Sequence, residues 1–208
     1  MPALHRSAAP AVLIVFLAGV GAQEREPASS RLGPVEEWET NSFELDRTSN
    51  TMTFDGFRIV GANWSLTADY ASALATELEF EAGEWRFDGN VRLDLDTASL
   101  EADSAVFTFR GKRLESVDLT GSPVAFEDAT GQDGSPVYGS AQSLRYNDAA
   151  GTFALLGQVS LTVGPYRTTG CDLVYYLGQE EFTTGSTQCE ERFRTIIVPE
   201  DTSRPTAD

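Results

Sequence analysis

The sequence predicts an all-β protein built from quasi-repeated strand units, and the stretch Trp85–Asp96 shows the pattern most clearly. Its odd positions are apolar and its even positions are polar, with a single glycine, Gly89, inside the apolar row. Because a strand sends successive side chains to opposite faces, this pattern is typical of a strand with one dry face and one wet face. Similar short runs, separated by turn residues, recur along the chain, whereas helical periodicity is weak.

The repeat is marked by glycines inside apolar runs, at spacings of 33, 32 and 36 residues: Gly56, Gly89, Gly121 and Gly157. A glycine within a strand usually marks a bulge or a bend. Three of these glycines are followed, twelve or thirteen residues later, by a small residue that we expect to open a new strand: Ala68, Ala102 and Gly170. Each unit is therefore predicted to run strand, glycine kink, strand, turn, strand. Units of this length bury their apolar faces by stacking on their neighbours.

The first half of the chain follows this pattern in order. The polar segment 46–50 has turn chemistry and separates Phe43–Leu45 from a strand expected over Thr51–Ile59. A further strand is expected over Trp64–Tyr70. The composition of Ala68–Leu78 would also allow a helical turn, but the repeat assigns this segment to strand and turn.

The second half repeats the pattern. Thr152–Val163 places apolar residues on one face with Gly157 in the same row, and Pro165 ends this strand or confines it to an edge. The run Leu173–Leu177 and the β-branched run Thr195–Val198 are the last expected strands.

The N-terminal residues have the features of an export signal. His5 and Arg6 precede the apolar run Ala8–Val20, and Val20–Ala22 resembles a cleavage site. The run is shorter than the roughly 18 residues of a membrane-spanning helix, although an uncleaved anchor is the alternative. We therefore expect a signal peptide over residues 1–22, a flexible leader over 23–36, one domain over 37–198 and a disordered tail over 199–208.

The charge balance limits the partners of the exported protein. Removing residues 1–22 takes Arg6 from the 15 basic residues and leaves 32 acidic ones, so the net charge changes from −17 to −18. Nucleic acids and anionic membrane surfaces both attract positively charged proteins. The composition therefore argues against non-specific binding to either of them.

Catalytic motifs are scarce in the sequence. The only histidine is His5, within the expected signal peptide, so histidine-based triads are absent from the mature chain. Neither a Gly-x-Ser-x-Gly elbow nor a phosphate-binding loop occurs, and we expect neither enzymatic activity nor a cofactor. A carboxylate cluster could bind calcium or serve a glycosidase, but its alternation fits the wet face of strands better: Asp94, Asp96, Glu101 and Asp103.

The two cysteines, Cys171 and Cys189, are expected to form a disulfide, because cysteines of exported proteins usually pair. Two separate buried thiols are the alternative. A zinc site is not expected, since no histidine is present to complete it.

The regular apolar face is the remaining candidate site. It allows two interpretations: the core of a two-layer β domain, or the lining of a groove for acyl chains. The residues concerned are Phe54, Trp64, Trp85, Phe87, Val91, Leu93, Phe126, Leu155, Val159 and Leu161.

An ordered series of short motifs resembles the OstA/LptA family of lipopolysaccharide-transport proteins. Leu119–Phe126 matches the pattern Gly-x-Pro-x-x-Phe, and Thr152–Val159 matches Leu-x-Gly-x-Val. Trp85–Asp96 is similar to a family strand that contains Gly-Asn-Val. The resemblance extends from about Trp38 to Ser186. In one place, Gly61–Ala68, the sequence is more similar to the related, membrane-anchored LptC.

The resemblance implies an open, twisted antiparallel β-jellyroll that carries the acyl chains of lipid A in its interior. It also implies a periplasmic bridge whose protomers add edge to edge, with LptC and the N-terminal domain of LptD as end partners. No catalytic residue and no cofactor come with the family. An LptC-like membrane-anchored component and a scaffold that binds no lipid are the alternatives.

Overall fold

The computed structural model describes residues 32–80, 82–111, 113–129, 136–176, 181–184 and 192–197. The described residues form one antiparallel sheet of eleven strands, which confirms the predicted all-β class. None of the described residues belongs to a helix long and apolar enough to cross a membrane. The expected signal peptide and C-terminal tail lie outside the described residues. The strands are β1 (Val35–Asp46), β2 (Thr51–Gly61), β3 (Trp64–Leu74), β4 (Ala82–Leu95), β5 (Ala98–Arg110), β6 (Arg113–Asp128), β7 (Val137–Asn147), β8 (Thr152–Val163), β9 (Tyr166–Tyr176), β10 (Glu181–Thr184) and β11 (Arg194–Ile197).

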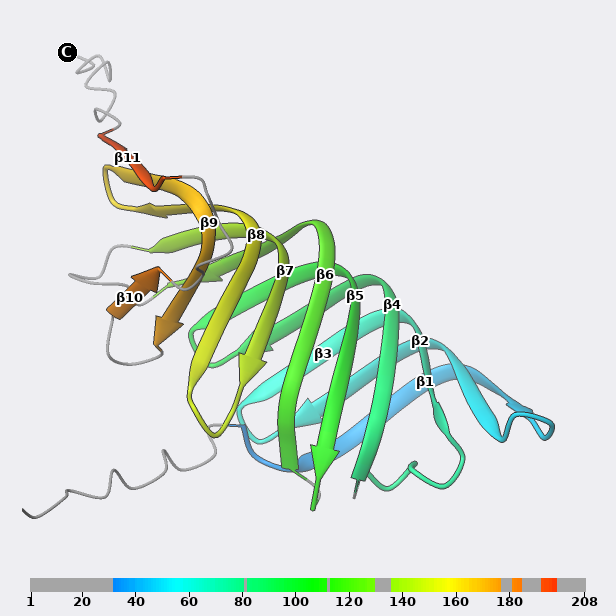
Figure 1. Ribbon diagram of the computed structural model, residues 1–208. Helices are drawn as coiled ribbons and strands as arrows, with labels where there is room; N and C mark the ends of the chain where they lie inside the picture. Colours follow the sequence, from blue (N-terminus) through cyan, green and yellow to red (C-terminus); the bar gives the residue numbers. More distant parts are fainter. Residues whose placement is uncertain are drawn as a thin grey trace, which may run out of the picture.

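The sheet is a meander in which each strand from β1 to β10 pairs with its neighbours in the sequence, while β11 also pairs with β9. Figure 1 shows the sheet running from β1 and β2 at one end to β9, β10 and β11 at the other. The segment with weak helical periodicity lies in β3 and the turn after it, as the repeat predicted. β1 begins at Val35, two residues before the expected start of the domain at residue 37.

The long strands are bent at their middle. Gly56, Gly89 and Gly157 have φ angles of +62°, +78° and +82°, a left-handed conformation that favours glycine. Gly121 is not left-handed, but the register of β6 and β7 shifts across it, between Thr120 and Val124. Register shifts of this kind bend a strand and increase its twist. The predicted kinks are therefore present, with left-handed glycines at three of the four positions.

The small residues expected to open new strands lie inside strands, so this part of the prediction was wrong. Ala68 and Ala102 are central in β3 and β5, next to register shifts, and Gly170 is in β9. In the sequence, a bulge inside a strand resembles the break between two strands, because both interrupt the alternation. Each repeat is instead a hairpin of two bent strands, in which the small residue pairs with an apolar residue beyond the glycine: Phe57 with Ala68, Val91 with Ala102, and Val159 with Gly170.

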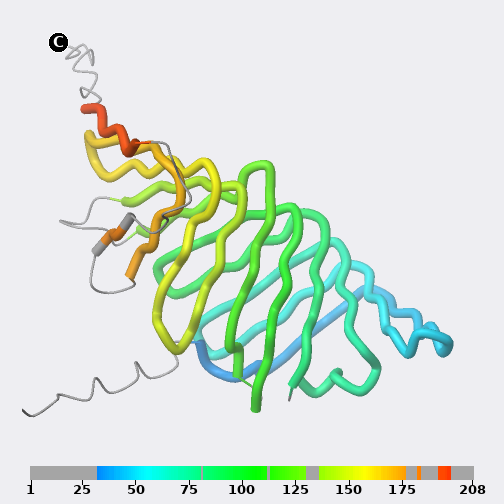
Figure 2. Tube along the Cα trace, in the orientation of Figure 1, coloured from blue at the N-terminus to red at the C-terminus, as the bar shows by residue number. Residues whose placement is uncertain are grey.

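The bends fold the sheet into two facing walls. In β4, residues 82–88 belong to the first wall and residues 91–95 to the second, and the other bent strands are divided in the same way. Figure 2 shows the chain passing repeatedly from one layer to the other along the sheet. Aromatic rings of opposite walls meet in the interior, with centroid distances of 5.4 Å for Phe57 and Trp85, 6.3 Å for Trp64 and Phe107, and 5.5 Å for Phe126 and Phe153.

Replacing Gly89 by alanine tests the bend. A Cβ atom at Gly89 would lie 2.7 Å from the Oδ2 atom of Asp69, in addition to the strain of the left-handed backbone. We expect Gly89→Ala to lower the free energy of unfolding by about 2–4 kcal/mol, measured by urea denaturation.

Gly111→Ala is the matched control, because Gly111 also has a positive φ, of +59°, but a Cβ atom at this position would have no neighbour within 4 Å. Its loss should be limited to the conformational strain, about 1 kcal/mol. Equal losses in the two variants would contradict a tightly packed bend at Gly89.

Candidate functional site: the apolar interior

The structure gathers all ten residues predicted for the apolar face into one interior. None of them has more than 5% of its surface exposed, and Trp85, Phe87 and Leu93 are fully buried. They belong to a single cluster that runs through the sheet from β2 to β9. The cluster is continuous and its members are buried, as in the core of a folded protein.

The interior also contains large side chains that simple alternation misses. Phe57 follows Phe54 by three positions, so an unbroken period of two would place it on the wet face, yet it is 1% exposed. Phe107 is also fully buried, because the register shift between Glu101 and Ser104 changes the face on which the following residues of β5 lie. In the sequence, Gly56 before Phe57 and Ala102-Asp103 before Phe107 mark the bulges and could have revealed this change of face.

The two walls are connected at the bend, where each long strand passes from one wall into the other. Within the described residues, every pair of hydrogen-bonded strands consists of neighbours in the meander or of β9 and β11, so no pairing links the walls at the side away from the bend. There, side-chain contacts hold the walls together: apolar packing and the hydrogen bond from the Tyr175 hydroxyl to Asp128. Separating them would expose apolar surface but would break no ladder of backbone hydrogen bonds.

Two buried carboxylates accompany the aromatic side chains of the interior. Asp148 accepts a hydrogen bond of 2.9 Å from the hydroxyl of Tyr146, and Asp128 accepts one of 3.3 Å from the hydroxyl of Tyr175. Both aspartates are less than 7% exposed. The tyrosines can therefore bury their rings in the interior while their hydroxyl groups remain hydrogen-bonded.

At the β1 end the interior reaches the surface. Trp38, Phe43 and Leu45 pair with Ile59, Phe54 and Met52, so they face the interior side of the sheet. They are nevertheless 40%, 66% and 43% exposed, because no further strand lies beyond β1 among the described residues. The ring of Trp38 stacks on that of Phe57 with a centroid distance of 5.5 Å. The apolar interior is thus continuous with an exposed apolar lip, which we define as Trp38, Phe43 and Leu45.

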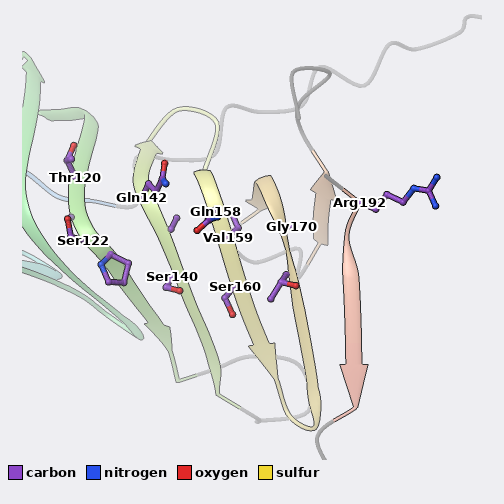
Figure 3. A pocket seen from close by; sticks show the side chains of 13 residues that line it. Thr120, Ser122, Ser140, Gln142, Gln158, Val159, Ser160, Gly170 and Arg192 are labelled. Carbon is purple, nitrogen blue, oxygen red and sulfur yellow. The ribbon is translucent and has the colours of Figure 1, made fainter. Parts of the chain in front are cut away.

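The outer face carries a polar hollow of about 760 Å³ over the bends of β6 to β9. Figure 3 shows hydroxyl and amide side chains around it, with the side chain of Arg192 pointing away from them. The groups include Thr120, Ser122, Ser140, Gln142, Gln158 and Ser160. This lining contrasts with the interior, which is apolar on the opposite face of the same strands.

The carboxylate cluster lies on the wet face. Arg92 forms ion pairs with Asp94 at 2.9 Å and with Glu101 at 2.6 Å, and all three side chains are about half exposed. The hydrogen bond that Arg92 donates to the carboxylate of Asp94 raises the pKa of the Arg92 guanidinium. Among the described residues, no three histidine, cysteine or acidic side chains come together to hold a metal ion. Two of the four carboxylates of the cluster, Asp94 and Glu101, thus form ion pairs with Arg92.

Cys171 is disulfide-bonded. Cys189 lies outside the described residues, so the pairing of Cys171 with Cys189 stays a prediction.

Comparison with known proteins assigns the family. The sequence profile of the LptA/(LptD N-terminal domain) LPS transport proteins matches residues 70–181, more than half of the chain. The chain belongs to this family. The match confirms the resemblance found in the sequence, and it covers strands β4 to β9, which enclose most of the interior.

The fold agrees with a solved relative. LptH of Pseudomonas aeruginosa, the LptA-homologous periplasmic component of the conserved lipopolysaccharide transport device, superposes with a TM-score of 0.51 at 16% identity, over 82% of this chain and 99% of that one. At this identity the similarity supports the predicted β-jellyroll alone. No curated protein sequence matches the chain significantly.

Truncating one interior ring tests the packing that this family member shows. Phe87 is fully buried between rings of β2 and β5, and Phe87→Ala should lower the free energy of unfolding by about 3–5 kcal/mol. Phe43→Ala, in the exposed lip, is the control and should change it by less than about 1 kcal/mol. Urea denaturation with an unchanged m-value measures both. A loss at Phe87 no larger than that at Phe43 would contradict a tightly packed interior.

Proposed function

We propose that this protein is a periplasmic lipopolysaccharide-binding transport protein that bridges the inner and outer membranes and carries acyl chains between its two walls. The observation that carries the proposal is the continuous apolar interior between walls that no pairing of the described strands joins at the side away from the bend. Membership of the LptA/(LptD N-terminal domain) family supports lipopolysaccharide as the cargo.

Acyl chains can take the place of side-chain contacts between the walls. When the walls part, apolar side chains such as Leu155, Val159 and Leu161 lose their partners across the interior, and an acyl chain lying there would restore the burial. Burial of apolar surface is worth roughly 25 cal/mol per Å². The exchange therefore needs no catalytic group and no change in backbone hydrogen bonding.

The charge of the protein suits a cargo bound through its lipid part. A net charge of −17 for the whole sequence does not attract an anionic head group. The phosphates and sugars would remain in solvent or be bridged by divalent cations, while the acyl chains supply the binding energy. In this proposal the signal peptide over residues 1–22 directs the protein to the periplasm.

The edges of the sheet supply the contacts of the bridge. An edge strand has unpaired N–H and C=O groups that can pair with a strand of another chain. Among the described strands, the twelve-residue β1 is such an edge. The expected partners are LptC and the N-terminal domain of LptD, with edge-to-edge self-association as the alternative use of the same edges.

A second candidate function is an assembly module that binds partners but no lipid. The burial of all ten predicted residues to 5% exposure or less favours it, because a closed core needs no ligand. This candidate predicts normal partner binding by a purified protein free of lipid. An LptC-like anchored component is a third candidate, supported by the sequence of Gly61–Ala68.

Site-specific photo-crosslinking in cells tests the proposed cargo site. A photo-reactive aromatic residue in place of Phe87 or Leu161, inside the interior, should form crosslinks to lipopolysaccharide, because acyl chains would lie against these positions. Tyr138 is the control position, since it lies on β7 opposite Thr162, the neighbour of Leu161 in β8, but is 48% exposed. Crosslinks from Tyr138 alone, or from none of the three positions in a protein that still reaches the periplasm, would refute the interior as the cargo site.

A further inference from the structure

The two ends of the sheet differ in the edge that they offer. Among the described strands, β1 is an edge strand of twelve residues. At the other end, two strands of four residues each cover the outer edge of β9: β10 pairs with residues 173–176 and β11 with residues 166–169. Figure 1 shows these two short strands against separate parts of β9. The long edge that β9 would otherwise offer is therefore divided.

The two short strands are held in place by more than their backbone pairing. The ring of Phe182 in β10 stacks on Tyr175 with a centroid distance of 4.7 Å and an interplanar angle of 22°. Phe193, which precedes β11, lies so close to Gly170 that a Cβ atom there would come within 2.5 Å of its ring. Both phenylalanines pack against the apolar interior. Cys171, between the two paired parts of β9, is disulfide-bonded.

This arrangement blocks the addition of a further strand to β9. The backbone of β9 is paired with β8 on one side and with β10 and β11 on the other. What remains at this end is a pair of four-residue edges, and very short edge strands are a known protection against edge-to-edge association. Among the described strands of this end, a β1 strand from a second copy finds no edge of matching length to join.

Two copies could also associate by pairing their β1 strands with each other. The charge of β1 argues against this arrangement. The strand contains five acidic residues and no basic one: Glu36, Glu37, Glu39, Glu44 and Asp46. Pairing about the middle of two antiparallel β1 strands would set Glu37 of each strand opposite Glu44 of the other. Like charges opposite one another destabilise a strand pair. A strand with basic side chains would instead complement this edge.

We propose that β10 and β11 form a cap that prevents strand addition at the β9 end, and that β1 takes an edge strand with basic side chains from a different protein. This inference rests on the proposed function and adds a direction to the bridge: the chain docks by strand addition through β1, and its contact at the capped β9 end is made without strand addition. The partner strand would meet the exposed lip of Trp38, Phe43 and Leu45, so that its own apolar surface could continue the interior.

Charge reversal tests the role of β1. The variant Glu36→Lys, Glu37→Lys, Glu44→Lys should remain monomeric alone, and so should the unchanged protein. Mixed together, the two should form a one-to-one dimer through oppositely charged β1 strands, and the dimer should weaken at high salt. The control variant reverses three exposed acidic residues away from the edge, Glu84→Lys, Asp88→Lys and Glu127→Lys, and should not dimerise with the unchanged protein. Light scattering over a wide concentration range measures the masses.

Release of the cap tests the role of β10 and β11. The full-length variant Phe182→Ser, Phe193→Ser, Cys171→Ser should self-associate as its concentration rises, because the edge of β9 becomes free for β1 of another copy. Ile197→Ser, which changes a 68% exposed residue of β11, is the control and should stay monomeric. If the triple variant does not fold, the single variant Phe193→Ser gives the answer: the amides of residues 166–169 should exchange about tenfold faster with solvent than in the Ile197→Ser control.

Opposite results overturn the proposal. Self-association of the unchanged protein into long assemblies, or a folded cap-release variant that stays monomeric, would refute the cap. Absence of the mixed dimer, or an equal dimer with the control variant, would refute β1 as the acceptor of a basic strand. None of these measurements requires bound lipid, so failure here would leave the lipopolysaccharide assignment standing, and failure of the photo-crosslinking would leave the cap standing.

Discussion

The bend at the middle of the strands is the constraint on which the rest of the structure depends. A sheet of this meander topology has one apolar face, and that face must be covered for the sheet to be stable in water. Because each long strand turns at the same level, the sheet covers its own apolar face with its other half. The left-handed glycines Gly56, Gly89 and Gly157 make this turn possible where a side chain would meet a polar group of the preceding strand.

The sequence predicts much of this arrangement because alternation and glycine placement are local properties. The strand class, the kinks and the burial of ten residues such as Trp85 and Leu161 follow from a period of two. The errors have one physical origin. At a bulge two consecutive residues face outward, so in the sequence Ala68 and Ala102 resemble the first residues of strands, and Phe57 and Phe107 fall outside the apolar row. The covering of β9 by β10 and β11 involves a long return of the chain, which no local pattern predicts.

The same bend connects the fold to the proposed function. A closed β-barrel would join its walls by strand pairing on both sides, whereas here the described strands join them only at the bend. In the proposed function, the interior would be the core of the unloaded protein and the site of the cargo. The ends give the sheet a polarity: an acidic, continuous edge with an apolar lip at β1, and a divided edge at β9.

The central claim is that the interior carries the acyl chains of lipopolysaccharide. Native mass spectrometry of the full-length protein, exported to the periplasm of a lipopolysaccharide-producing host and purified without detergent, tests it most directly. The account predicts that part of the protein carries a bound species that releases lipid A fragments on dissociation, and that replacing the interior residue Leu161 by aspartate abolishes this species. A folded protein that binds its partners but contains no such lipid, in any fraction, would contradict the account.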